Sequence, residues 1–117
     1  MGMAVETITI DCSEPDRLAA WWARALPGAV TAVMPGEFVL VMHDGGPKLG
    51  FQRVDDPTPG KNRVHVDFSV ADLETEVERL VSLGATETAH HSFGEDFRWV
   101  VLTDPDGNAF CLAAAQE

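Results

Sequence analysis

Hydrophobic and polar residues alternate in the middle of the chain, at residues 63–70. Valines and a phenylalanine occupy every second position, and His65, Asp67 and Ser69 occupy the positions between them. Successive side chains of a strand leave opposite faces. The pattern therefore predicts a strand with one apolar face and one face that carries chemically active groups.

Similar patterns recur in a repeated order, a strand, a helix and three further strands. In the first half we expect strands at residues 5–12, 29–34, 37–43 and 49–54, with a helix between Ser13 and Pro27. In the second half we expect strands at residues 63–70, 85–91, 97–103 and 109–115, with a helix at 72–83 and a loop at 92–96. The repetition predicts an α+β fold of two βαβββ modules.

The two modules, at about 5–56 and 63–116, are expected to form a single domain over residues 1–117. Residues 55–62 are polar, rich in proline and glycine, and read as the linker between the modules. With the helices outside, the strands would form a curved mixed sheet around a concave cavity. The polar faces of the two first strands would look into that cavity.

Local signals define the two helices. Ser13 and Asp72 are the expected N-caps, because short polar side chains bond free backbone N–H groups there. Gly84 is expected to end the second helix. Apolar residues at steps of three and four predict that one stripe of each helix packs on its sheet. These residues are Leu18, Trp21, Trp22, Ala25 and Leu26 in the first helix, and Leu73, Val77, Leu80 and Val81 in the second.

Composition fits a folded protein and disfavours nucleic acid as a partner. Of the 117 residues, 45% are hydrophobic and 23% are charged, which is ordinary for a globular chain. The 19 acidic and 8 basic residues give a net charge of -11, which repels an anionic backbone. Lys61 and Arg63 form a local basic cluster that could meet a small anion.

Neither a disulfide framework nor a membrane segment is indicated. Cys12 and Cys111 lie far apart and lack metal-knuckle spacing. No apolar run approaches the roughly 20 residues that span a bilayer. The N-terminal residues lack the pattern of a signal peptide, so a cytoplasmic location is expected.

Several residues are candidates for a site, each with a structural alternative. His65 and Asp67 read as an acid/base pair, or as a hydrogen-bonded part of the sheet's polar face. Asp11, like Asp67, is either a cavity carboxylate or a helix cap. Trp99 would supply an aromatic wall if its face is the concave one.

Two further candidates have a structural interpretation from the sequence alone. Cys111 is interpreted as a small buried residue rather than a nucleophile, since the sequence shows no base beside it. His90 and His91 are interpreted as edge or loop residues, because adjacent strand residues point to opposite faces.

These features together resemble the vicinal oxygen chelate superfamily, and more narrowly its small glyoxalase-like domain proteins. The resemblance covers residues from about 5 to 115. It rests on the βαβββ duplication and on Lys61–Asp67, Leu83-Gly84-Ala85 and Asp104–Cys111. It implies the glyoxalase/bleomycin resistance/dioxygenase fold and a homodimer. The reaction is not implied, because this fold serves lyases, isomerases, dioxygenases and antibiotic-binding proteins.

The resemblance also implies which positions would hold a metal ion. Superfamily members that do chemistry hold a divalent metal with His, Gln or Glu side chains from the first and last strands of each half. Carried over, this places His65 at one ligand position and Gln52 at or near a second. Cys111 occupies the usual carboxylate position, and the first strand offers Thr7 or Thr9. Two ligands of four are too few, so no metal is predicted. If one binds, His65 and Gln52 would hold it, and His65 with Cys111 would favour zinc.

The expected function is binding of a small organic metabolite or antibiotic, with acid/base chemistry or sequestration. The expected catalytic residues are His65 and Asp67, and the expected ligand contacts are Asp11, Gln52, Trp99, Phe38 and Cys111. The alternative is a metal-dependent lyase, isomerase or dioxygenase, with glyoxalase I activity itself disfavoured. A structural or protein-binding role would follow if the cavity were filled by its own side chains. The sequence leaves open whether the protein is an enzyme.

Overall fold

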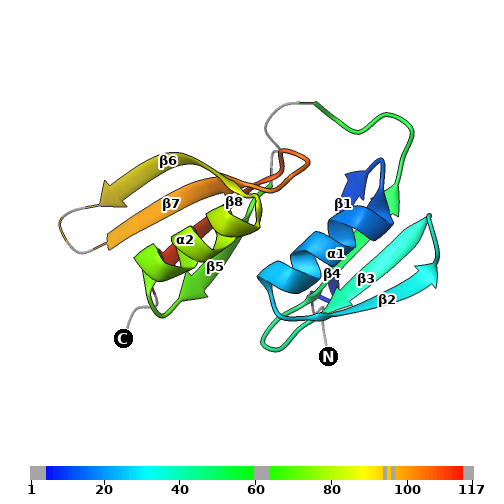
Figure 1. Cartoon of the computed structure of the whole chain (residues 1–117), viewed down its shortest axis with the longest axis horizontal. Helices are drawn as coiled ribbons and strands as arrows, with labels where there is room; N and C mark the ends of the chain where they lie inside the picture. The colour runs from blue at the N-terminus through cyan, green and yellow to red at the C-terminus, as the bar shows by residue number, and fades with distance from the viewer. Residues whose placement is uncertain (1–4, 60–63, 94, 96, 115–117) are drawn as a thin grey trace. The chain divides into compact units, whose positions relative to one another are not determined.

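The computed structural model describes residues 5–59, 64–93, 95 and 97–114. The chain divides into two compact units, Met1–Pro57 and Thr58–Glu117. In its described part each unit has a strand, a helix and three further strands, as Figure 1 shows. This confirms the predicted α+β fold of two βαβββ modules. The single-domain reading stays a prediction, and residues 60–62 of the expected linker, with Lys61, lie outside the described part, as does Arg63.

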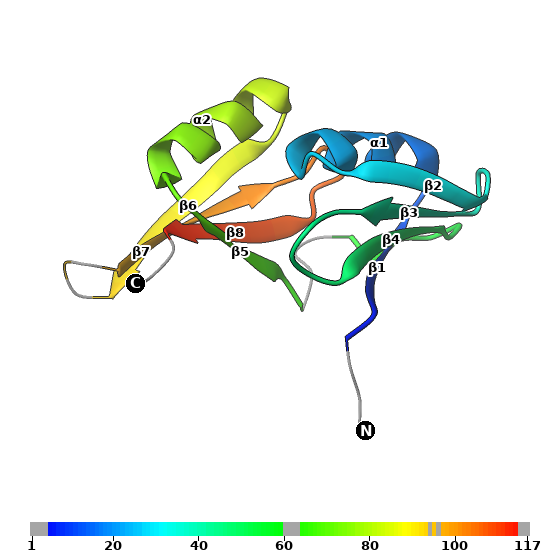
Figure 2. The same cartoon turned by 90° about the horizontal axis from the view of Figure 1, so that it is seen from below.

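The first unit packs one helix on a four-stranded mixed sheet. Its elements are β1 (Thr7–Cys12), α1 (Pro15–Ala25), β2 (Ala29–Met34), β3 (Phe38–Met42) and β4 (Lys48–Arg53). The sheet order is β1-β4-β3-β2, with β1 and β4 parallel and the other pairs antiparallel. Figure 2 shows α1 over one face of this sheet. The buried residues between them include Leu18, Trp21, Trp22, Val39, Val41, Leu49 and Phe51.

The second unit repeats this arrangement. Its elements are β5 (Val66–Val70), α2 (Leu73–Leu83), β6 (Thr86–Phe93), β7 (Phe97–Thr103) and β8 (Ala109–Ala114). The sheet order is β5-β8-β7-β6, again with a parallel pair, β5 and β8. Its buried residues include Leu73, Val77, Leu80, Val100, Leu102, Phe110 and Leu112. Burial alternates along β7 with the period of a strand, whereas the first four residues of β8 are all buried.

The two helices begin in different ways. Asp72 caps α2 as predicted, because its Oδ1 accepts a hydrogen bond from the backbone N–H of Thr75 at 3.1 Å. The prediction for Ser13 is wrong, since Glu14 occupies the N-cap position of α1 and no side chain caps it. Pro15 begins that helix, and a residue without an N–H removes one of the donors that a cap would satisfy.

Other boundaries of the second unit were predicted in part. Gly84 ends α2 in the left-handed conformation, φ 116°, as expected. The loop expected at 92–96 begins later, because Ser92 pairs with Arg98 and β6 continues to Phe93. Val81 is 44% exposed, so its place in the apolar stripe is wrong.

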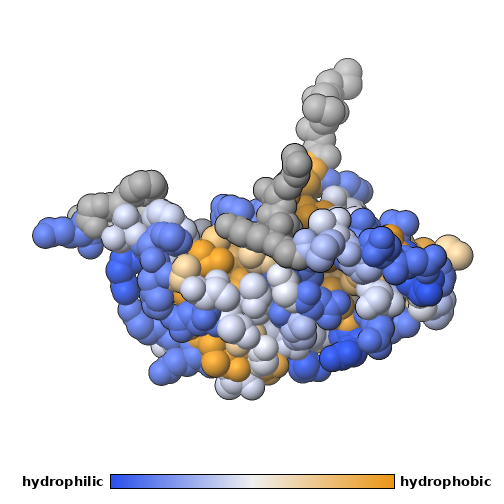
Figure 3. All heavy atoms as spheres, turned by 90° about the horizontal axis from the view of Figure 1, so that it is seen from above, coloured by the Kyte–Doolittle hydropathy of each residue, from blue (hydrophilic) through white to orange (hydrophobic). Residues whose placement is uncertain are grey.

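Apolar side chains are also exposed on the first unit. Edge strand β2 is exposed at all six positions, and its large apolar residues are Val30, Val33 and Met34. On the face in Figure 3, hydrophilic residues predominate among the coloured atoms, and apolar residues form separate patches.

Among the residues that the structure describes, neither helix has the length and apolar character needed to cross a membrane.

Candidate functional site

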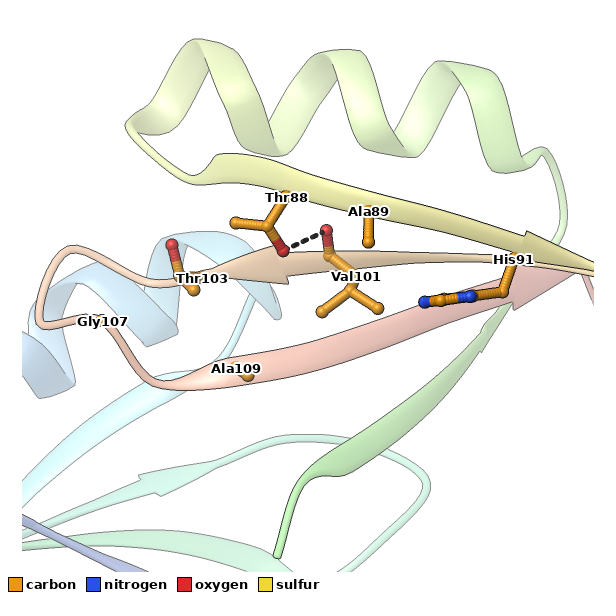
Figure 4. Close-up of a pocket in the computed structure, with 7 residues that line it drawn as sticks. All are labelled: Thr88, Ala89, His91, Val101, Thr103, Gly107 and Ala109. Carbon is orange, nitrogen blue, oxygen red and sulfur yellow. Dashed lines mark hydrogen bonds between the residues drawn. The ribbon is translucent and has the colours of Figure 1, made fainter. Parts of the chain in front are cut away.

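Strand pairing in the second unit decides which side chains share a face. Asp67 of β5 pairs with Cys111 of β8, and Cys111 pairs with Val101 of β7. Trp99 lies two residues before Val101 and faces the same side. Figure 4 shows the side chains of Val101 and Ala89 pointing away from α2. The sheet face opposite α2 therefore carries Asp67, Cys111 and Trp99 together, which the sequence alone left open.

His65, directly before β5, joins this face. Its Nδ1 lies 2.8 Å from Oδ1 of Asp67 and 3.8 Å from Sγ of Cys111. The His65 side chain is 42% exposed and that of Asp67 69% exposed, whereas Cys111 is only 7% exposed. The histidine therefore reaches solvent while it covers a buried thiol.

The two contacts of His65 limit the chemistry of the cluster. Both involve Nδ1, and one ring nitrogen cannot donate to a carboxylate and take a thiol proton at once. A cysteine–histidine–carboxylate relay divides these roles between the two ring nitrogens. In a neutral ring, Nδ1–H donates to Asp67 and Nε2 keeps its lone pair. The arrangement suits proton transfer at Nε2 better than attack by Cys111.

The helix-cap alternative for the two aspartates is wrong. The N-cap positions belong to Glu14 in α1 and Asp72 in α2. Asp67 instead holds His65, and Asp11 lies on β1 at the register position that pairs with Gln52.

The metal centre that the resemblance implies can be tested against the donors present. One ligand atom each from His65, Asp67 and Cys111 lies within 4.8 Å of the others. A thiolate and an imidazole suit zinc, whereas magnesium and manganese prefer oxygen ligands. The set therefore fits zinc and not an oxygen-seeking ion. Gln52 lies in the other unit, so its pairing with His65 at a metal stays a prediction.

A pocket of about 310 Å³ opens on the same face, as Figure 4 shows. It is lined by Thr88, Ala89, His91, Val101, Thr103, Gly107 and Ala109. Val101 pairs with Cys111, and Ala109 lies two residues before Cys111 on β8. The pocket is therefore next to the thiol that His65 covers.

An irregularity in β6 shapes this pocket. The register shifts between Glu87 and Ala89, so Thr88 and Ala89 both line the pocket although they are adjacent. A bulge re-aims side chains in this way. Oγ1 of Thr88 donates to the carbonyl of Val101 at 3.2 Å, which ties the irregular segment to β7.

His91 is the site residue that the sequence interpretation missed. It lies on edge strand β6 as expected, but its ring stacks on Trp99 with centroids 5.1 Å apart and planes at 26°. His91 also lines the pocket, so the aromatic wall expected from Trp99 includes a second ring. Only the pairing of β6 with β7 places the two rings together.

The first unit carries the remaining candidates on its own equivalent face. Asp11 pairs with Gln52, and Gln52 pairs with Phe38. Counted from the helix N-caps Glu14 and Asp72, Thr9 and Asp67 occupy the same position, so Gly50, which pairs with Thr9, corresponds to Cys111, which pairs with Asp67. Thr7, two residues before Thr9, is the counterpart of His65. The structure thus divides the candidate residues between the units: the first unit carries Asp11, Gln52 and Phe38, and the second carries His65, Asp67, Cys111 and Trp99.

Part of the first unit's face is filled by its own side chains. A Cβ at Gly50 would lie 3.0 Å from Oγ1 of Thr9 and 3.2 Å from Cε1 of Phe38. The Phe38 ring therefore lies over Gly50, in the position that corresponds to Cys111 of the second unit. That the two faces enclose one cavity stays a prediction.

Comparisons with known proteins agree with this architecture. The model of the glyoxalase-like domain matches residues 7–113. A glyoxalase/bleomycin resistance protein/dioxygenase family enzyme of Burkholderia phytofirmans has a TM-score of 0.82 at 16% identity, over 97% of this chain and 100% of that chain. A lactoylglutathione lyase of Agrobacterium tumefaciens has a TM-score of 0.73 at 16% identity, over 97% of this chain and 95% of that chain.

The fosfomycin resistance protein FosX of Mesorhizobium loti gives a TM-score of 0.75 at 14% identity, over 99% of this chain and 95% of that chain. No curated protein sequence matches the chain significantly. At these identities the structural matches establish the fold, and the reaction has to be argued from the residues themselves.

Proposed function

Since the chain belongs to the glyoxalase-like domain family, we propose that it binds a small organic molecule and exchanges a proton with it at Nε2 of His65. The match over residues 7–113 confirms the resemblance seen in the sequence. The observation that carries the proposal is the 2.8 Å contact between Nδ1 of His65 and Oδ1 of Asp67 on the open face of the second sheet.

The dyad has the form that general acid/base catalysis requires. Asp67 accepts the Nδ1 proton, which fixes the tautomer and the orientation of the ring. Nε2 is then the free basic atom, and the partly exposed ring can meet a ligand. The adjacent pocket supports a bound molecule within reach of this face. The proposed reaction is proton abstraction or donation, without a required metal.

A nitrobenzisoxazole provides a test, because its ring opening reports a base directly. The base removes the C–H proton, the electron pair forms a nitrile, and the N–O bond breaks to release a coloured phenolate. We expect saturable turnover that falls by about 10²-fold or more in His65→Gln, in the range of a general base. His90→Gln is the matched control, since His90 lies on the opposite sheet face and pairs with Glu87. Equal rates in the two variants would contradict the proposal.

A metal-dependent lyase, isomerase or dioxygenase is the second candidate, and the close approach of one ligand atom each from His65, Asp67 and Cys111 favours it specifically. His65, Asp67 and Cys111 would hold the ion, which would act as a Lewis acid toward a ligand oxygen. Zinc titration with a competing chelator separates the candidates. Tight 1:1 binding that is lost in Cys111→Ser and kept in Cys12→Ser, with turnover that requires the ion, would replace the metal-independent proposal.

A homodimer is the proposed assembly. Edge strand β2 presents Val30, Val33 and Met34 to solvent within its unit, and exposed apolar edges favour a covering partner. Light scattering after size exclusion should give the dimer mass, and Val33→Lys should lower it. A monomer mass for the unmodified protein would contradict this. The cytoplasmic location expected from the sequence remains a prediction.

A further inference from the structure

The pocket beside Cys111 indicates the chemical class of the bound molecule. Resting on the proposed function, we infer that this pocket takes an uncharged planar ring, aromatic or heteroaromatic, as the molecule that exchanges a proton with His65. The inference depends on the lining of the pocket, on the paired rings at its side and on its place relative to the dyad.

The lining selects against charge. No acidic or basic side chain, apart from the titratable ring of His91, is among its described lining residues. Ala89, Val101 and Ala109 supply aliphatic surface, and an ionic group placed on such surface loses hydration without a counter-charge. The protein's net charge of -11 further disfavours anions. An uncharged molecule avoids both costs.

The rings at the pocket's side favour a planar ligand. His91 is stacked on Trp99 at 26°, so its orientation is set before a ligand arrives. In Figure 4 the His91 ring extends from β6 along the sheet face toward Val101. Aromatic rings prefer offset-stacked or edge-to-face neighbours. A flat ring lying on the aliphatic surface can meet His91 in one of these arrangements, whereas a puckered ring cannot stack.

Polar groups at the pocket allow limited hydrogen bonding. Thr103 and His91 can each bond a hydroxyl, carbonyl or amide of the ligand, and the Thr88 hydroxyl is engaged with Val101. A volume of about 310 Å³ is at the lower end of small-molecule sites. The ligand class is therefore a compact ring with one or two neutral polar substituents.

Benzamide, benzoate and benzamidine test the charge, because they share one shape and differ in charge. Cyclohexanecarboxamide tests planarity with the neutral substituent retained. Methyl resonances of Ala89, Val101 and Ala109 report binding in the full chain. We expect saturable shifts with benzamide and at least tenfold weaker binding of the other three. Comparable binding of any of them, or no saturable shift with benzamide, would overturn the inference.

Variants locate the binding and separate it from the proton transfer. Ala89→Phe fills the pocket from an edge strand and should abolish the benzamide shifts, whereas Ala20→Phe, at an exposed position of α1 in the first unit, should retain them. The His91→Phe variant should bind benzamide, because it retains an aromatic ring, and the His91→Ala variant should not. His65→Gln should keep the shifts while losing elimination activity. Benzamide binding without His65-dependent elimination would reject the proposed reaction alone, and the reverse outcome would reject this inference alone.

Discussion

Removal of the Asp67 carboxylate separates the role of Asp67, which orients the imidazole ring, from the role of His65, which acts as the base. In Asp67→Ala the imidazole of His65 loses its Nδ1 acceptor at 2.8 Å but keeps Nε2. Both side chains are substantially exposed, 42% and 69%, so the hydrogen bond is screened by water. Such a bond contributes about 1 kcal/mol to the preferred tautomer. At 1.4 kcal/mol per factor of ten, its loss should lower the elimination rate about fivefold.

The expected order of effects is therefore graded. His65→Gln removes the base and should cost about 10²-fold or more in the nitrobenzisoxazole assay. Asp67→Ala should cost about fivefold in kcat/KM with an unchanged melting temperature. Ser69→Ala, an exposed position on the same strand, is the matched control. A loss in Asp67→Ala as large as in His65→Gln would contradict an orienting role for Asp67, since Asp67 would then act on the ligand itself. No loss at all would also refute it.

Two predictions concern stability. Asp72→Ala should destabilise the protein by about 1 kcal/mol in urea unfolding through loss of the α2 cap, whereas Ser13→Ala should have little effect because Ser13 caps nothing. The hydrogen bond from Arg98 holds the pKa of the exposed Glu74 below its ordinary value of 4.5. Its contribution is present above the unfolded pKa and lost as pH falls through the folded pKa. Glu74→Gln should therefore be less stable than the unmodified chain at neutral pH, with the difference vanishing in acid; a difference that persists there would contradict this.

The fold was predictable because its signals are local. Alternating residues define the strands, and Gly84 and Asp72 mark the ends of α2, where backbone geometry and hydrogen bonding depend on one residue. The two wrong boundaries have different causes. Ser13 was expected to cap α1, but the helix begins after Glu14, and pairing with β7 extends β6 through Ser92.

For the candidate site, the sequence predicted only which residues of a single strand lie on the same face. His65 and Asp67 lie two residues apart, so the sequence places them on one face. Cys111 joins them because β5 and β8 pair in parallel at one register, and a single sequence does not specify that register. The stacking of His91 on Trp99 depends in addition on the bulge in β6. Long-range pairing thus assembles the site.

The tautomer of His65 decides whether Nε2 can act as the base. Long-range ¹H–¹⁵N correlation of the imidazole in the unmodified protein distinguishes a protonated from an unprotonated ring nitrogen. In the neutral ring we expect the proton on Nδ1, held by Asp67, and an unprotonated Nε2. Asp67→Ala should weaken this preference. A neutral ring protonated at Nε2 in the unmodified protein would contradict the proposed base.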